Sequence, residues 1–293
     1  MNILITGGAG FIGSNLIENL VQLQNIKNIT SLDNYISGKQ QNHIDNKKVT
    51  YLTGNTTEIN NNIMLKNFVP DVVFHFGEFS RIITSFDNCD TVFKSNITGT
   101  IEVIKYCATQ KAKLIYSCSS SILGNNGEDA KLNPYSYCKK MIKDLIIQYS
   151  NWFELKYVIC YFYNVYGNRQ ISVGEYSTVV GIFENQYANN QYLTIVAPGT
   201  QQRYFTHVND IVAGLKLLLD ENVIGDNYHI GSQIKYDILS LAKMFNHKYM
   251  FVPERKGERL SACEPVLEKI NALGWSEKEN LYNYINNFTN KTV

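Results

Sequence analysis

The chain has 293 residues, and its 44% hydrophobic content can fill a core without help from a membrane. A net charge of +1 argues against bulk electrostatic binding to nucleic acid or to an anionic membrane surface. Six cysteines without a C-x-x-C pair predict reduced thiols of a cytoplasmic protein, rather than a disulfide framework or a metal site.

The first predicted strand covers residues 3–5, which leaves no room for a signal peptide, and no apolar stretch approaches the ~20 residues of a membrane helix. Residues 6–13 then read Thr-Gly-Gly-Ala-Gly-Phe-Ile-Gly and open a helix. Gly7 permits a tight turn, Gly10 lets the backbone approach a pyrophosphate, and Gly13 lets helix and strand pack closely. Because a helix N-terminus attracts anions, we predict that Gly7, Gly10, Phe11, Ile12 and Gly13 bind a dinucleotide.

A second strand at residues 29–32 ends in Asp33, which lies 20 residues beyond Gly13. An acid at this place accepts hydrogen bonds from the adenosine ribose and repels a 2′-phosphate. The sequence therefore predicts NAD rather than NADP as cofactor, with Asp33 and the neighbouring Asn34 among its contacts.

Strands and helices alternate through the rest of the first half. Strands are predicted at residues 71–76, 113–117 and 156–161, and helices at 96–110 and 135–150. This pattern predicts an α/β fold with a doubly wound parallel (Rossmann) sheet, in which His75 packs in a core strand.

After about Gly167 the pattern loosens, which predicts a smaller C-terminal substrate lobe, and one helix at residues 209–219 returns to the sheet. We expect residues 1–167, with a returning segment at about 207–230, to form the dinucleotide-binding domain. Residues 168–206 and 231–293 form the substrate lobe in this division.

Tyr135 and Lys139 stand four residues apart on a predicted helix and therefore share a face. An ammonium beside a phenol stabilises the phenolate, which can act as a base. The alternative for the motif alone is an ordinary exposed pair. Ser119, in a run of serines at the end of the strand at 113–117, can hydrogen-bond a substrate oxygen.

Seven motifs occur in a characteristic order. They are the glycine turn, Asp33-Asn34, the serine run, Tyr135-x-x-x-Lys139, the segment 164–170, the segment 203–210 and the segment 255–258, which ends in Glu258. From residue 3 to about Trp275 the chain resembles the extended short-chain dehydrogenase/reductases, most of all the branch of UDP-galactose and UDP-N-acetylglucosamine 4-epimerases. The resemblance implies tightly bound NAD, a nucleotide-sugar substrate, and a homodimer paired through the helices that follow Asn96 and Tyr135.

The same resemblance implies roles for individual residues. Ser119 and Tyr135 fall on the catalytic serine/threonine and the base, and Lys139 falls on the lysine that holds the nicotinamide ribose. Further cofactor contacts fall on Lys39, Asn55, Phe76, Gly77 and Asn96. Substrate contacts fall on Glu78, Ser119, Ser120, Asn164, Arg203, Arg255 and Ala262, the two arginines on the nucleotide phosphates.

Three of these positions depart from the family pattern. Asn55 replaces an acid near the adenine, and Ala262 replaces a bulky residue, which predicts room for a 2-acetamido group on the sugar. Glu78 replaces a small apolar residue, and a carboxylate in that place is costly unless it is paired. We expect Glu78 to pair with Arg81 or to face the substrate.

The leading functional hypothesis is an NAD-dependent 4-epimerase of a UDP-hexose or UDP-N-acetylhexosamine. A 4,6-dehydratase needs a further acid and base after the catalytic serine, where this chain has Ser120 and Ser121, although Glu78 offers a substitute. A UDP-uronate decarboxylase and a 4-keto-sugar reductase are other enzymes of the family, but Asp33 disfavours the NADPH of a reductase. A catalytically silent dinucleotide-binding protein is the alternative outside enzymology.

Overall fold

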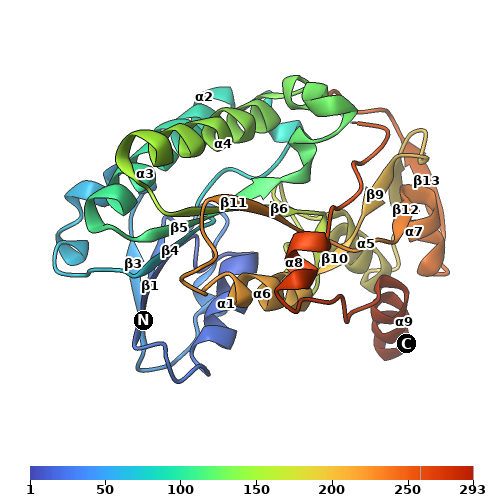
Figure 1. The fold of residues 1–293 in the computed structure, drawn as a ribbon. Helices are drawn as coiled ribbons and strands as arrows, with labels where there is room; N and C mark the ends of the chain where they lie inside the picture. Colours follow the sequence, from blue (N-terminus) through green and yellow to red (C-terminus); the bar gives the residue numbers. More distant parts are fainter. Residues whose placement is uncertain (258, 293) are drawn as a thin grey trace.

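Seven parallel strands form the central sheet of the computed structural model, which describes residues 1–257 and 259–292. Their order is β11–β6–β5–β4–β1–β2–β3 (Figure 1). The strands are β1 (Asn2–Thr6), β2 (Asn28–Asp33), β3 (Val49–Thr53), β4 (Val72–His75), β5 (Lys113–Ser119), β6 (Tyr157–Phe162) and β11 (Asp226–Ile230). The strand order reverses between β1 and β4, and ligands of such sheets bind at this point, beyond the carboxyl ends of the strands. The predicted doubly wound parallel sheet is confirmed.

Helices cover both faces of this sheet (Figure 1). The longer ones are α1 (Phe11–Leu20), α3 (Thr100–Gln110), α4 (Pro134–Phe153) and α6 (Val208–Leu217). Because side chains alternate along a strand, Ile3 and Ile5 of β1 pack in the core cluster with α1 and α6, whereas Leu4 packs in the cluster with α3 and α4. Both faces of β1 are thus buried, which explains its continuous apolar sequence.

The prediction of a helix at residues 96–110 is confirmed, but its first turn is a π-helix. The α-helical part α3 begins at Thr100, and a π-helix, η5 (Phe93–Gly99), precedes it. The Asn96 amide in this wider turn binds both backbone groups of Phe79, at 2.7 and 2.8 Å, and so joins the π-helix to the loop after β4. The edge strands β3 and β11 were not predicted.

Short helical turns occupy the connections. They are η1 (Gln40–Asn42), η2 (Thr56–Asn61), η3 (Ile63–Leu65), η4 (Ile83–Ser85), α2 (Cys89–Val92), η6 (Ser120–Ile122) and η7 (Asn125–Lys131). Of these, η6 follows β5 directly, so it carries the serine run from the sheet edge toward α4.

The C-terminal part of the chain builds three small sheets of two strands. These pair β7 (Val165–Tyr166) with β10 (Thr206–His207), β9 (Gln202–Tyr204) with β12 (Lys235–Asp237), and β8 (Leu193–Val196) with β13 (Tyr249–Val252). The remaining helices are α5 (Val179–Ala188), α7 (Ile238–Met244), α8 (Glu268–Ala272) and α9 (Leu281–Thr292).

A third hydrophobic cluster, separate from the two that flank the main sheet, lies in this C-terminal part. It joins Phe183 of α5, Ile195 of β8 and Leu241 of α7. The helix α6 returns to the main sheet, as the sequence predicts. We propose the division into residues 1–167 with 207–230, and 168–206 with 231–293, because the second group has this core of its own.

All six cysteines are free thiols, four of them buried. Over residues 1–257 and 259–292, no three His, Cys, Asp or Glu side chains are grouped so that they could hold a metal ion. In the same residues, no helix has the length and apolar character needed to cross a membrane.

Candidate active site

The glycine turn between β1 and α1 has the geometry of a phosphate-binding loop. Gly7 has φ +74°, and a Cβ there would lie 2.9 Å from the Gly77 nitrogen. A Cβ on Gly13 would lie 2.3 Å from the Gly7 carbonyl oxygen, so only glycine fits at both positions. Residues Phe11, Ile12 and Gly13 open α1 and line the cavity described below. Their N–H groups have no acceptor within the helix, which makes this end of α1 an anion site.

The Asp33 carboxylate lies at the end of β2, beside this turn. It accepts hydrogen bonds from the backbone N–H groups of Ala9 (2.9 Å) and Tyr35 (2.8 Å). Burial raises the pKa of Asp33, whereas these two hydrogen bonds act in the opposite direction. Asp33 and Asn34 line the cavity, where the carboxylate can accept further hydrogen bonds from a ribose.

A cavity of about 740 Å³ extends from the glycine turn past the carboxyl ends of β4 and β5 to the C-terminal part of the chain. It has the size of a cofactor and substrate site. The described predicted residues that line it are Gly7, Gly10, Phe11, Ile12, Gly13, Asp33, Asn34, Phe76, Gly77, Glu78, Ser119, Ser120, Tyr135, Lys139, Asn164, Arg203 and Arg255.

The three predicted catalytic residues meet on one wall of this cavity. The Asn133 side chain caps α4 by accepting the Ser136 N–H at 2.8 Å, which places Tyr135 in the first turn of the helix. Lys139 follows one turn later, with its Nζ 5.9 Å from the centre of the Tyr135 ring. Ser119 ends β5, and its Oγ accepts the Ser121 N–H at 3.1 Å.

Glu78 pairs with Lys139, so the predicted pairing with Arg81 is wrong. The Lys139 ammonium donates to the Glu78 carboxylate and to the Ser117 carbonyl. The two side chains are only 2% and 4% exposed. Glu78 pairs with Lys139 rather than Arg81 because its carboxylate is directed toward α4. The buried Lys139 ammonium on that helix requires an anion.

Further donors complete the environment of Glu78. The Tyr116 hydroxyl and the Thr100 hydroxyl donate to Glu78 Oε1, at 3.1 and 3.0 Å. Thr100 also bonds His75 Nε2 at 2.9 Å, and burial lowers the pKa of His75 to about 4. Burial would lower the pKa of Lys139 as well, but Glu78 outweighs this effect and raises it. Lys139 is therefore a fixed cation beside Tyr135.

Four predicted contacts do not line the cavity. Lys39 is exposed, and Asn55 accepts a hydrogen bond from the Asn34 side chain at 3.0 Å. Asn96 lies behind the wall, where its amide is occupied by Phe79. Ala262 packs against the core cluster of α3 and α4, so the expected effect on a 2-acetamido group has no support in the geometry. Glu258 of the last motif lies outside the described residues.

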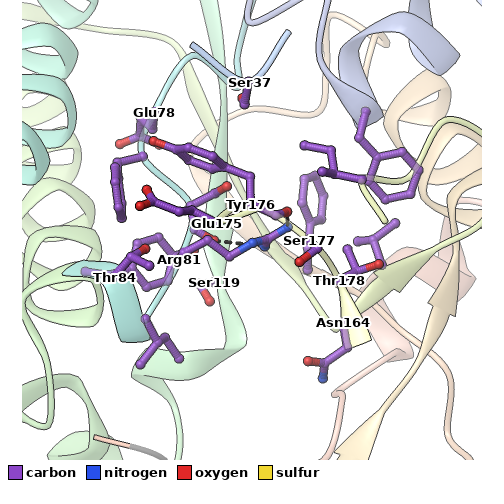
Figure 2. A pocket seen from close by; sticks show the side chains of 18 of the residues that line it. Ser37, Glu78, Arg81, Thr84, Ser119, Asn164, Glu175, Tyr176, Ser177 and Thr178 are labelled. Atoms are coloured by element: carbon purple, nitrogen blue, oxygen red, sulfur yellow. Dashed lines mark hydrogen bonds between the residues drawn. The ribbon is translucent and has the colours of Figure 1, made fainter. Parts of the chain in front are cut away.

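The other end of the cavity carries the predicted phosphate ligands. Arg203 is buried on β9 and donates to the Gln202 carbonyl at 2.8 Å, whereas Arg255 is exposed in the segment after β13. Asn164 donates to the Tyr204 carbonyl at 3.0 Å and lies apart from Ser119 in Figure 2. Guanidinium groups at the end of a cavity suit a diphosphate, and that of Arg203 is also held in place by the Gln202 carbonyl.

Two further arginines line the cavity: Arg81, which was predicted only as a partner of Glu78, and Arg259, which was not predicted. Arg259 donates to the Ser120 carbonyl at 2.7 Å, and Arg81 donates to the Tyr176 carbonyl. Figure 2 shows Arg81 extending across the cavity toward Tyr176. Arg259 directly follows the motif at residues 255–258, and this position was the one sequence feature that pointed to it. Its contact with Ser120 could not be predicted, because the two residues are 139 positions apart in the sequence.

Comparisons with known proteins agree with this geometry. Residues 3–231 match the NAD dependent epimerase/dehydratase family. A UDP-N-acetyl-alpha-D-glucosaminuronate decarboxylase of Bacillus cytotoxicus is 30% identical over 82% of this chain and 78% of its own. A putative UDP-glucose 4-epimerase of Methanocaldococcus jannaschii is 27% identical over 95% and 94% of the two chains. The crystal structure of a UDP-glucose 4-epimerase from Thermotoga maritima has a TM-score of 0.89 at 24% identity, covering 100% of this chain and 99% of its own, and so shares the fold.

Proposed function

Because the chain belongs to the NAD-dependent epimerase/dehydratase family, we propose that it is a nucleotide-sugar 4-epimerase that works through a transient 4-keto sugar. One observation carries the choice of reaction: the positions that a dehydratase fills with an acid and a base after the catalytic serine are Ser120 and Ser121 here, and the Glu78 carboxylate is engaged by Lys139. The arrangement thus supports oxidation and reduction at one carbon without an elimination step.

NAD fits the residues at the sheet edge, and when bound it would supply the hydride acceptor and donor for C4 of the sugar. The N-terminus of α1 would hold its pyrophosphate and Asp33 its adenosine ribose, while the Asp33 charge would repel a 2′-phosphate. This preference for NAD argues against a reductase that releases NADPH.

Tyr135 takes the proton of the sugar 4-hydroxyl and later returns it, as a general base and acid. Ser119 hydrogen-bonds the same oxygen, and the Lys139 ammonium stabilises the phenolate. Arg203 and Arg255 hold the diphosphate, so the keto sugar stays attached while it presents its other face.

A dimer belongs to the same proposal. On α4, Tyr137, Met141 and Trp152 are 47%, 43% and 61% exposed, and they follow one another at helical spacing. A second copy of the chain that packs its own α3 and α4 against this face would cover them.

The test is an NMR assay of purified protein with NAD and with UDP-hexoses or UDP-N-acetylhexosamines in deuterated water. Epimerisation is expected to give both C4 epimers without exchange at C5, whereas a dehydratase exchanges the C5 hydrogen. Tyr135→Phe should abolish turnover while NAD binding stays nearly intact. Full activity of this variant would refute the assignment of the base, and no conversion of any nucleotide sugar would refute the function.

A further inference from the structure

Two arginines lie beside the catalytic wall without a role in the proposed reaction. Arg81 follows β4, and Arg259 lies between β13 and α8. The Tyr135 phenol contributes to the electrostatic environment of both guanidinium groups. Both line the cavity, where Arg259 binds the carbonyl of Ser120, the neighbour of Ser119, and Figure 2 shows Arg81 extending toward Tyr176.

Neither guanidinium has a carboxylate within ion-pair distance in residues 1–257 and 259–292. Arg81 donates to the carbonyls of Ser80 (3.0 Å) and Tyr176, and its buried Nε has no partner in the described structure. Arg259 is 8% exposed and donates to the carbonyl and hydroxyl oxygens of Ser120, at 2.7 and 3.3 Å. These neutral acceptors leave the positive charges uncompensated.

The surrounding charges do not cancel them either. Burial lowers the pKa of Arg81 to about 10, which reflects the cost of a desolvated cation. Burial also lowers the pKa of Arg259, and Asp129 opposes this only from beyond ion-pair distance. Glu175, which also lines the cavity, is exposed. The charge of the Lys139 ammonium is already compensated by the Glu78 carboxylate.

Arg203 and Arg255 are the residues that we assign to the diphosphate, so Arg81 and Arg259 have no ligand in the proposed reaction. A guanidinium offers a planar pair of donors that matches a carboxylate.

We propose that the sugar of the substrate carries a carboxylate, and that Arg81 and Arg259 bind it, so that nucleoside diphosphate hexuronates are preferred over the neutral hexoses. The inference rests on the proposed nucleotide-sugar site and narrows its substrate class. In this arrangement the carboxylate accepts the hydrogen bond of the Arg81 Nε–H and places one negative charge between the two cations.

Calorimetric titration of the full-length Tyr135→Phe protein loaded with NAD tests this preference without turnover. The ligands, each titrated separately, are UDP, the pair UDP-glucose and UDP-glucuronate, and the pair GDP-mannose and GDP-mannuronate. For the nucleotide that binds better, UDP or GDP, the nucleotide hexuronate should bind at least tenfold more tightly than the corresponding nucleotide hexose. Adding Arg81→Gln should reduce this advantage to less than about threefold, with the affinity for the nucleoside diphosphate unchanged.

Arg255→Gln is the matched control, because it should weaken the binding of the nucleoside diphosphate, of the nucleotide hexose and of the nucleotide hexuronate by the same factor. Arg259→Gln is a second test, with its melting temperature checked because Arg259 also supports Ser120. Equal affinity for hexose and uronate, or an advantage that survives Arg81→Gln, overturns the inference and leaves the nucleotide-sugar site standing. If no nucleoside diphosphate binds at all, the proposed function fails and takes this inference with it.

Discussion

Removing the charge of Glu78 is expected to destabilise the protein strongly. Glu78→Gln keeps the shape of the side chain but leaves the Lys139 ammonium, 4% exposed, without its anion. Breaking a buried ion pair by removing one partner costs about 3–5 kcal/mol, because the remaining charge is uncompensated. Against a typical stability of about 5–15 kcal/mol, this loss is a large fraction of the whole.

Urea denaturation of the NAD-free protein, followed by circular dichroism, measures the effect. The variants are Glu78→Gln, Lys139→Met and the double substitution, which together form a thermodynamic cycle. The double variant should be more stable than the sum of the single losses predicts, with a coupling energy of about 2 kcal/mol or more. The matched control is Glu128→Gln, because the Glu128–Lys131 pair is 58% and 60% exposed and its loss should not be measurable.

A loss below about 1 kcal/mol for Glu78→Gln, together with no coupling in the cycle, would refute the reasoning. That result would mean that Lys139 finds equal compensation from Ser117 and from water. It would also remove the argument that Glu78 keeps Lys139 charged.

Three further predictions concern other parts of the molecule. His75 stays neutral in the folded protein down to about pH 4, whereas the unfolded chain takes up a proton on this residue below pH 6.5. The free energy of unfolding should therefore decrease as the pH is lowered from 6.5 to about 4. This pKa difference contributes about 3 kcal/mol to the free energy of unfolding. Urea denaturation at several pH values should therefore show a smaller decrease in stability at acidic pH for His75→Gln than for the wild-type protein. Gly13→Ala should weaken NAD binding at least tenfold in calorimetry, because its Cβ would meet the Gly7 carbonyl at 2.3 Å, whereas Gly225→Asn, in open space, should bind NAD normally. Met141→Glu on α4 should convert the proposed dimer to a monomer in sedimentation velocity, whereas Met64→Glu, which is also at an exposed methionine, should not; a dimer that survives Met141→Glu contradicts the proposed interface.

The features that the sequence predicts correctly are local ones. The need for glycine at position 13 arises from the Gly7 carbonyl six residues earlier, and the common face of Tyr135 and Lys139 follows from the helical repeat. Strands buried on both faces are also recognisable, because their apolar residues run without interruption, as in β1 and β6.

What the sequence does not predict depends on contacts between distant segments. Glu78 lies 61 residues before Lys139, and only the packing of α4 against the loop after β4 decides that they pair. Asn96 was expected at the cofactor, but the π-helix turns its amide to Phe79. The edge strand β3 was missed because it is half-exposed and therefore has no clear hydrophobic pattern.

Asp33 serves two purposes with one carboxylate. In the proposed cofactor site it accepts hydrogen bonds from an adenosine ribose, and its hydrogen bond from Ala9 also ties the glycine turn to the end of β2. A smaller, neutral residue in its place would make room for a phosphorylated ribose and at the same time release the turn that we propose to bind the pyrophosphate. Redesign of this enzyme toward NADP thus requires a second anchor for Ala9 alongside the exchange at position 33.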